Sequence, residues 1–162
     1  MISPEAMKEA AARFPSGVTL VGCTHDNESH AVTVSAFSSV SLTPPLVMVC
    51  IGNASRMRDM IAQSGAFSVS VLAEEHEGIS NDCARPGRPP LDVDNPQRPG
   101  FRKGVTGSPI REDSVSYFDC RLHSITEAGD HTIFVGAVED GGHQPQRKPL
   151  VYWYRDYRQL ST

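Results

Sequence analysis

Several residue patterns that mark metal and redox sites are missing from the sequence. It has four cysteines and six histidines, but no CxxC pair, no HxxxH and no HExxH motif. The absence of CxxC argues against a zinc knuckle and against a thioredoxin-like redox site. Because the histidines are scattered, we expect no metal site. The cysteines lie mostly in apolar stretches and are interpreted as small buried side chains in a reducing compartment.

Positive charge is also scarce. The 15 lysines and arginines are outnumbered by 19 aspartates and glutamates, which gives a formal net charge of −4. A dedicated nucleic-acid binder needs basic residues to replace condensed counterions, so we expect no nucleic-acid partner. No apolar run approaches the roughly 20 residues that span a bilayer, and the first residues lack a secretory signal. We therefore expect no membrane association and a cytoplasmic location.

The glycine-rich fingerprints of nucleotide-binding α/β folds are absent as well. Neither GxGxxG nor GxxxxGK[ST] occurs in the chain. Both motifs bring backbone N–H groups close to phosphates at the start of a helix. A nucleotide that binds this chain must therefore be held by another device.

What is present indicates one mainly β domain over residues 1–162. This length suits a single domain with a real core, and 39% of the residues are hydrophobic. Short apolar segments joined by short polar links favour an antiparallel, Greek-key-like β-barrel with short flanking helices over a parallel sheet. About seven strands are expected, at 18–23, 31–37, 46–51, 67–72, 114–126, 132–138 and 150–154. The continuous apolar run of 46–51 predicts a strand buried on both faces.

Three helices and one long loop complete the expected outline. Ser3 is typical of an N-cap and begins an amphipathic helix that should lie on something larger. Ser55 is a candidate cap and Gly65 a candidate stop of a second helix. Residues 74–84 form a short third helix. Residues 85–109 hold six of the twelve prolines and predict a long irregular loop, which is usually functional or mobile.

The segment from Val32 to Ser41 carries five hydroxyl side chains in ten residues. On a strand over 31–37, Thr33, Ser35 and Phe37 share one face. Small hydroxyl side chains leave the backbone approachable, so this face suits the edge of a flat heterocycle or a phosphate. An ordinary Ser/Thr-rich edge strand with a solvated face has the same composition.

Three further segments are candidates for ligand contact. Ser55-Arg56 at a helix start offers free N–H groups, the helix dipole and a guanidinium to an anion, or is simply an N-cap beside a surface arginine. His131 follows the turn Gly129-Asp130 and is expected at the start of a strand. Its side chain either contacts a ligand there or is simply the residue after an ordinary turn. Residues 151–157 gather four of the eleven aromatics, as a stacking wall or as core or interface packing.

Six segments in order resemble the flavin reductase-like family, which includes the reductase components of two-component flavin monooxygenases. They are Arg13–Thr19 (RFPSGVT), Thr33–Leu46 (TVSAFSSVSLTPPL), Ser55-Arg56, Phe67–Leu72 (FSVSVL), Gly129–Val138 (GDHTIFVGAV) and Pro149–Tyr152 (PLVY). Each motif is weak, but together they keep the family's order across nearly the whole chain. One departure is Cys83, where the family often has an aromatic residue.

The resemblance implies a split β-barrel that forms a homodimer, with FMN or FAD held near the subunit interface. It implies that the flavin is lined by Thr33, Val34, Ser35, Ala36, Ser38, Ser39, Cys50, Ile51, Met57, Ala84 and Arg85. Ser55 and Arg56 are expected to meet the phosphate. His131 and Tyr154 are expected where the nicotinamide of NADH or NADPH docks, with His131 as the residue nearest the chemistry.

The activity implied by the resemblance is flavin reduction. A hydride passes from C4 of the nicotinamide to N5 of the flavin, and the reduced flavin then diffuses to a partner oxygenase. The protein supplies orientation and a partly dry cleft. Two alternatives stay open: a flavoprotein oxidase or oxygenase that retains FMN and acts on an organic substrate, and a non-catalytic flavin-binding protein.

Overall fold

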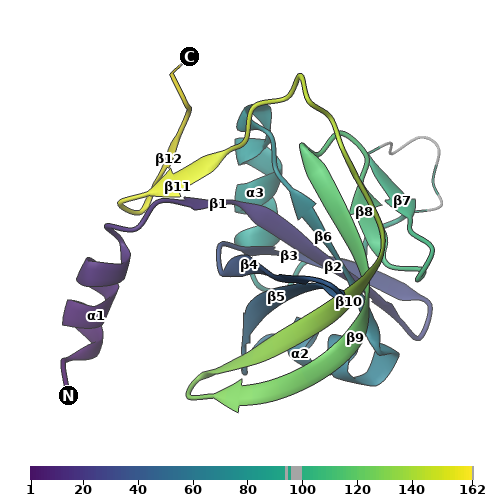
Figure 1. The fold of residues 1–162 in the computed structure, drawn as a ribbon, viewed down its shortest axis with the longest axis horizontal. Coiled ribbons are helices and arrows are strands. Elements are labelled where there is room, and N and C mark those ends of the chain that lie inside the picture. Colours follow the sequence, from purple (N-terminus) through teal and green to yellow (C-terminus); the bar gives the residue numbers. More distant parts are fainter. Residues whose placement is uncertain (94, 96–99, 162) are drawn as a thin grey trace.

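The computed structural model describes residues 1–93, 95 and 100–161. A seven-stranded antiparallel sheet in the order β3-β2-β6-β9-β10-β5-β4 dominates it (Figure 1). Its strands are β2 (Thr19–His25), β3 (Glu28–Val34), β4 (Phe37–Leu42), β5 (Pro45–Gly52), β6 (Ala66–Val71), β9 (Ser116–Ala128) and β10 (His131–His143). The sheet curls around a hydrophobic core, so the expectation of a mainly β, antiparallel barrel is confirmed.

Smaller elements flank this sheet. They are the sheet of β1 (Ser16–Gly17), β11 (Val151–Trp153) and β12 (Asp156–Arg158), the pair β7 (Phe101–Lys103) and β8 (Pro109–Arg111), and the helices α1 (Pro4–Ala11), α2 (Arg56–Ser64), η1 (Glu74–His76) and α3 (Glu77–Ala84). Among the described residues, no helix combines the length and the apolar character needed to cross a membrane.

The hairpin of β2 and β3 turns at Asp26 and Asn27. Their φ angles are 49° and 62°, and His25 pairs with Glu28 across the turn. Two positive φ values in a two-residue loop match the right-handed twist of the flanking strands. This turn lies in the polar link expected between the strands at 18–23 and 31–37, and it places Glu28 at the first position of β3.

The core lies between the curled strands and the inner face of α2. Phe67 and Phe134 are its largest fully buried side chains. The ring of Phe67 packs directly against the backbone of Gly136, because a Cβ on this glycine would lie 2.6 Å from Cζ of the ring. Because cores are packed to crystal-like density, that contact leaves no room for a methyl group. The family-like GxV at the middle of β10 is therefore a packing requirement.

Helix α2 begins and ends as the sequence predicts. Ser55 is the N-cap, and its Oγ accepts from the N–H of Met57 at 3.3 Å. Gly65 adopts the left-handed conformation with φ 68°, and its N–H donates to the carbonyl of Ile61 at 3.0 Å. Met60 is buried in the core. The buried inner face fixes the helix, and its N-terminus is thereby presented at the surface.

Helix α1 is capped by Ser3 as expected but does not lie on the barrel. The structure describes this helix in full, and it buries none of its side chains. Figure 1 shows it standing apart from the large sheet. The prediction that it lies on something larger is wrong within one chain, because its amphipathic pattern has no partner surface there.

Two strand predictions need correction. The strand expected at 31–37 ends at Val34, since Ser35 and Ala36 form a bend before β4. Thr33, Ser35 and Phe37 therefore do not share one face of a strand. Strand β5 alternates between buried and half-buried side chains, so it is buried on one face and not on both.

The segment 85–109 is also less irregular than predicted. It contains β7 and the start of β8, and Leu91 forms a bridge with Ser29 through an N–H to carbonyl bond of 2.6 Å. The bridge covers part of β3, which is the edge strand of the large sheet. Covering an edge in this way satisfies backbone groups that would otherwise face solvent. Residues 94 and 96–99 of the predicted loop lie outside the described residues.

Candidate functional site

A pocket of about 220 Å³ opens between the end of β3 and the end of β5, and we call it the β3–β5 pocket. Strand pairing explains its assembly: β10 runs antiparallel to β5, which sets His131 opposite Gly52 and Ile133 opposite Cys50. The pocket is lined by Val32, Thr33, Val34, Ser35, Ala36, Cys50, Ile51, Gly52, Ser55 and His131. Eight of the predicted site residues thus meet in one place.

The bend at Ser35 and Ala36 shapes this pocket. The carbonyl of Ser35 accepts from the N–H of Phe37, and that of Ala36 accepts from the N–H of Cys50, both at 3.0 Å. These bonds tie the bend to β4 and β5 and leave small side chains along the pocket wall. The hydroxyl of Thr33 is already used, because it donates to the carbonyl of Ser80 at 2.6 Å. Thr33 therefore anchors α3, and its hydroxyl does not point freely at a ligand as expected.

His131 stands half-exposed at the mouth of the pocket. Its Nδ1 lies 2.7 Å from Oδ1 of Asp130, and this hydrogen bond lowers the pKa of the Asp130 carboxyl. With Asp130 ionised, the tautomer that carries its proton on Nδ1 donates to this carboxylate and leaves Nε2 as an acceptor. The ring packs beside Gly52, where a Cβ would lie in ordinary van der Waals contact with Nε2, at 3.9 Å.

A second pocket of about 550 Å³ adjoins the first and shares Val32 and Ser55 with it. We call it the arginine pocket. Its lining residues are His30, Val32, Ala54, Ser55, Arg56, Met57, Met60, Ala84, Arg85, Pro86, Gly87 and Arg88. The N-terminus of α2 and three arginines meet here, which is the donor set that binds phosphate. The predicted residues Ser55, Arg56, Met57, Ala84 and Arg85 all belong to it.

Other predicted residues lie elsewhere. Tyr154 lines a third pocket of about 440 Å³, between α1, the bend and the C-terminal hairpin, and Arg13 lies 4.4 Å above its ring. Ser35 and Ala36 line this pocket too, which makes it a neighbour of the β3–β5 pocket. Ser38 and Ser39 line none of these three pockets. They are exposed on β4, and the hydroxyl of Ser38 donates to the carbonyl of Ser39.

Sequence reasoning missed three residues of the site. Gly52 could have been recognised, because it directly follows the apolar run 46–51 and has no side chain at the end of β5. His30 lacked a distinctive pattern, although its ring is buried and its Nε2 has no hydrogen-bond partner among the described residues. Arg88 depends on the path of its loop: its guanidinium donates to the carbonyls of Ala31 and Arg85.

The thiol in the β3–β5 pocket is inert at neutral pH. Burial raises the pKa of Cys50 above that of a free thiol. A protonated thiol is a weak nucleophile and a poor metal ligand. Within the described part of the chain, His, Cys, Asp and Glu side chains form no group that could hold a metal ion. Cys50 is therefore best read as an apolar wall of the pocket.

Fold and site together define a barrel protein in which a small pocket adjoins a larger one that three arginines and the N-terminus of α2 line. Residues 11–161 match the family model described as "Flavin reductase like domain", and the chain belongs to this family.

Three relatives illustrate the similarity. The reductase component of a 4-hydroxyphenylacetate 3-monooxygenase from Thermus thermophilus is 38% identical over 157 residues, which cover 96% of both chains. The flavin reductase component of a bacterial two-component tryptophan halogenase superposes with a TM-score of 0.91, at 34% identity and 99% coverage of both chains. An NADH:FAD oxidoreductase from Streptomyces globisporus, solved with NAD and FAD fragments, gives a TM-score of 0.88 at 30% identity, covering 99% of this chain and 96% of that one.

Proposed function

We propose that this protein is an NAD(P)H-dependent flavin reductase that supplies reduced FMN or FAD to a partner monooxygenase. The observation that carries the proposal is the junction of the two pockets at Ser55 and Val32. One pocket suits a flat ring and the other a phosphate, and the two adjoin each other. The relatives, which are named as flavin reductases and reductase components, support the same reaction.

The residues present fit a flavin nucleotide. The β3–β5 pocket has small walls at Ser35, Ala36 and Gly52, so a planar ring can approach the backbone closely. The arginine pocket offers Ser55 and Arg56 at the start of α2 for the phosphate. A flavin held there would supply the two-electron chemistry, as the acceptor of a hydride from the reduced nicotinamide, which would become NAD(P)⁺.

The role of this chain is to orient the two reactants and to keep water out. His131 presents Nε2 as an acceptor at the mouth of the β3–β5 pocket, where it can accept from the carboxamide N–H of a nicotinamide. Asp130 holds the ring in that orientation. Hydride transfer between two cofactors needs no general base, so His131 is a positioning group here. Tyr154, in the adjacent pocket, is proposed to border the nicotinamide.

We further propose a homodimer acting in the cytoplasm. Helix α1 buries none of its described side chains, and two large apolar side chains are exposed: Phe14, which lines the pocket that contains Tyr154, and Leu42, at the end of β4. A second copy is the natural cover for these apolar side chains. All four cysteines are free, which suits a reducing compartment. Light scattering of the purified protein should give twice the mass of the chain, and the mass of a monomer would refute the proposed homodimer.

The activity is tested by steady-state oxidation of NADH and NADPH at increasing concentrations of FMN, FAD and riboflavin. The proposal predicts turnover that saturates in free flavin. A yellow protein that retains FMN and is inert toward both reductants would overturn it and favour an oxidase or oxygenase. Flavin binding without any turnover would favour a non-catalytic flavin carrier.

A further inference from the structure

An ion pair joins Arg56, which lines the arginine pocket, to Glu28. Nη2 of Arg56, the first residue of α2, contacts Oε2 of Glu28, the first residue of β3. Both side chains are partly exposed, at 62% for Arg56 and 48% for Glu28. The hydrogen bond from Arg56, followed by its charge, lowers the pKa of Glu28. Glu28 is therefore ionised at neutral pH and holds the guanidinium that the proposed phosphate site needs.

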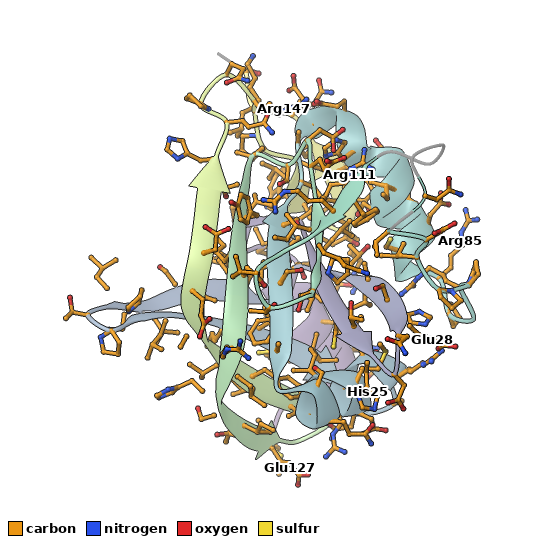
Figure 2. The ribbon with its side chains drawn as sticks, turned by 90° about the vertical axis from the view of Figure 1, so that its right-hand side faces the viewer. His25, Glu28, Arg85, Arg111, Glu127 and Arg147 are labelled. Atoms are coloured by element: carbon orange, nitrogen blue, oxygen red, sulfur yellow. The ribbon has the colours of Figure 1, made fainter. Side chains whose placement is uncertain are left out.

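The other two arginines of the pocket are less closely paired with carboxylates. Arg88 donates to two carbonyls, and Arg85 lies 3.7 Å from a carboxyl oxygen of Asp82. His30 lies 3.7 Å from Glu28, but burial, followed by the charge of Arg56, lowers its pKa and keeps it neutral. Figure 2 shows Glu28 and Arg85 on the same side of the molecule. Glu28 is thus the carboxylate in direct contact with the cation nearest the α2 N-terminus.

We propose that Glu28 is a selectivity-determining residue that competes with the flavin phosphate for Arg56. This inference rests on the proposed function. A phosphate dianion must displace the carboxylate from Arg56 and then remain near its negative charge, so both effects lower the affinity for FMN. Riboflavin has no phosphate and avoids both costs. The competition keeps FMN loosely held, as a flavin must be if it leaves after reduction.

The test is the ratio of dissociation constants, riboflavin over FMN, measured by quenching of flavin fluorescence. Glu28→Gln removes the charge and keeps the shape of the side chain. An exposed ion pair is weak, so releasing Arg56 from it should raise the ratio by about two- to fivefold. Glu127→Gln is the matched control. It removes an exposed carboxylate 2.9 Å from Arg58, another arginine of α2 that stays paired with Asp59, and it changes the net charge equally.

The same substitution made in the Arg56→Gln variant distinguishes competition for Arg56 from simple charge repulsion by Glu28. In Arg56→Gln there is no guanidinium to compete for, so adding Glu28→Gln should change the ratio by less than about twofold. The inference is overturned if Glu28→Gln leaves the ratio unchanged, if Glu127→Gln raises it equally, or if the gain persists without Arg56. Binding is measured without turnover, so these outcomes are independent of the reductase assay. Wild-type protein that binds flavins but never oxidises NADH refutes the proposed function alone.

Discussion

Replacing His131 by alanine tests how the protein positions the nicotinamide. The side chain is 51% exposed, so its loss should leave the stability of the fold within about 0.5 kcal/mol. It removes Nε2, which is an acceptor at the mouth of the pocket when the proton is on Nδ1. One neutral hydrogen bond is worth about 1 kcal/mol net, so kcat/KM for NADH should fall about fivefold. The dissociation constant of FMN should stay the same, because the nicotinamide and not the flavin loses a contact.

The assay is steady-state NADH oxidation at saturating FMN, with flavin binding measured separately by fluorescence. His25→Ala is a suitable control, because His25 also pairs with the aspartate next to it in a hairpin, at 3.3 Å, and lines none of the three pockets described above. Its kcat/KM should match wild type. An unchanged kcat/KM in His131→Ala, or an equal loss in both variants, would refute the positioning role.

Three further substitutions and treatments probe the frame of the site. Gly136→Ala puts a methyl group 2.6 Å from Phe67 and should destabilise the fold by about 1–3 kcal/mol, seen as a lower midpoint of thermal unfolding; an unchanged midpoint would contradict the packing argument. Ser55→Ala removes the cap of α2 and should cost about 1 kcal/mol of stability while weakening FMN more than riboflavin; equal weakening would argue against a phosphate site. Iodoacetamide should alkylate Cys50 more slowly than free cysteine at about pH 8, because burial raises the pKa of its thiol, and bound FMN should slow the alkylation further. Comparison with Cys50→Ser identifies Cys50 as the alkylated residue. Fast alkylation that FMN does not affect would place the thiol outside the pocket.

Local signals in the sequence predicted the elements that depend on local chemistry. Ser55 and Gly65 mark the two ends of α2, because a side-chain cap and a left-handed residue satisfy backbone groups within the helix itself. The hairpin turn before Glu28 follows from the same kind of signal. The Ser55-Arg56 pair and His131 were recognisable because both stand where an element begins.

Features that depend on contacts between distant segments were not predictable in this way. The alternation of Thr33, Ser35 and Phe37 continues through a bend that is held only by bonds to β4 and β5. Leu91 pairs with Ser29 through the path of a long loop that no local pattern specifies. Helix α1 packs on no surface of this chain, and the helical spacing of its apolar residues does not predict which surface the helix contacts. The sequence located most of the site, and the tertiary structure decided which side chains face it.

Anaerobic reduction of excess free FMN by NADH tests the central claim most directly. A small amount of flavin-free protein is mixed with both reactants, and the loss of flavin absorbance is counted per protein chain. The account predicts that each chain reduces many equivalents of FMN, because the flavin binds, accepts the hydride and leaves. Reduction that stops at one equivalent per chain, or does not occur, would contradict it.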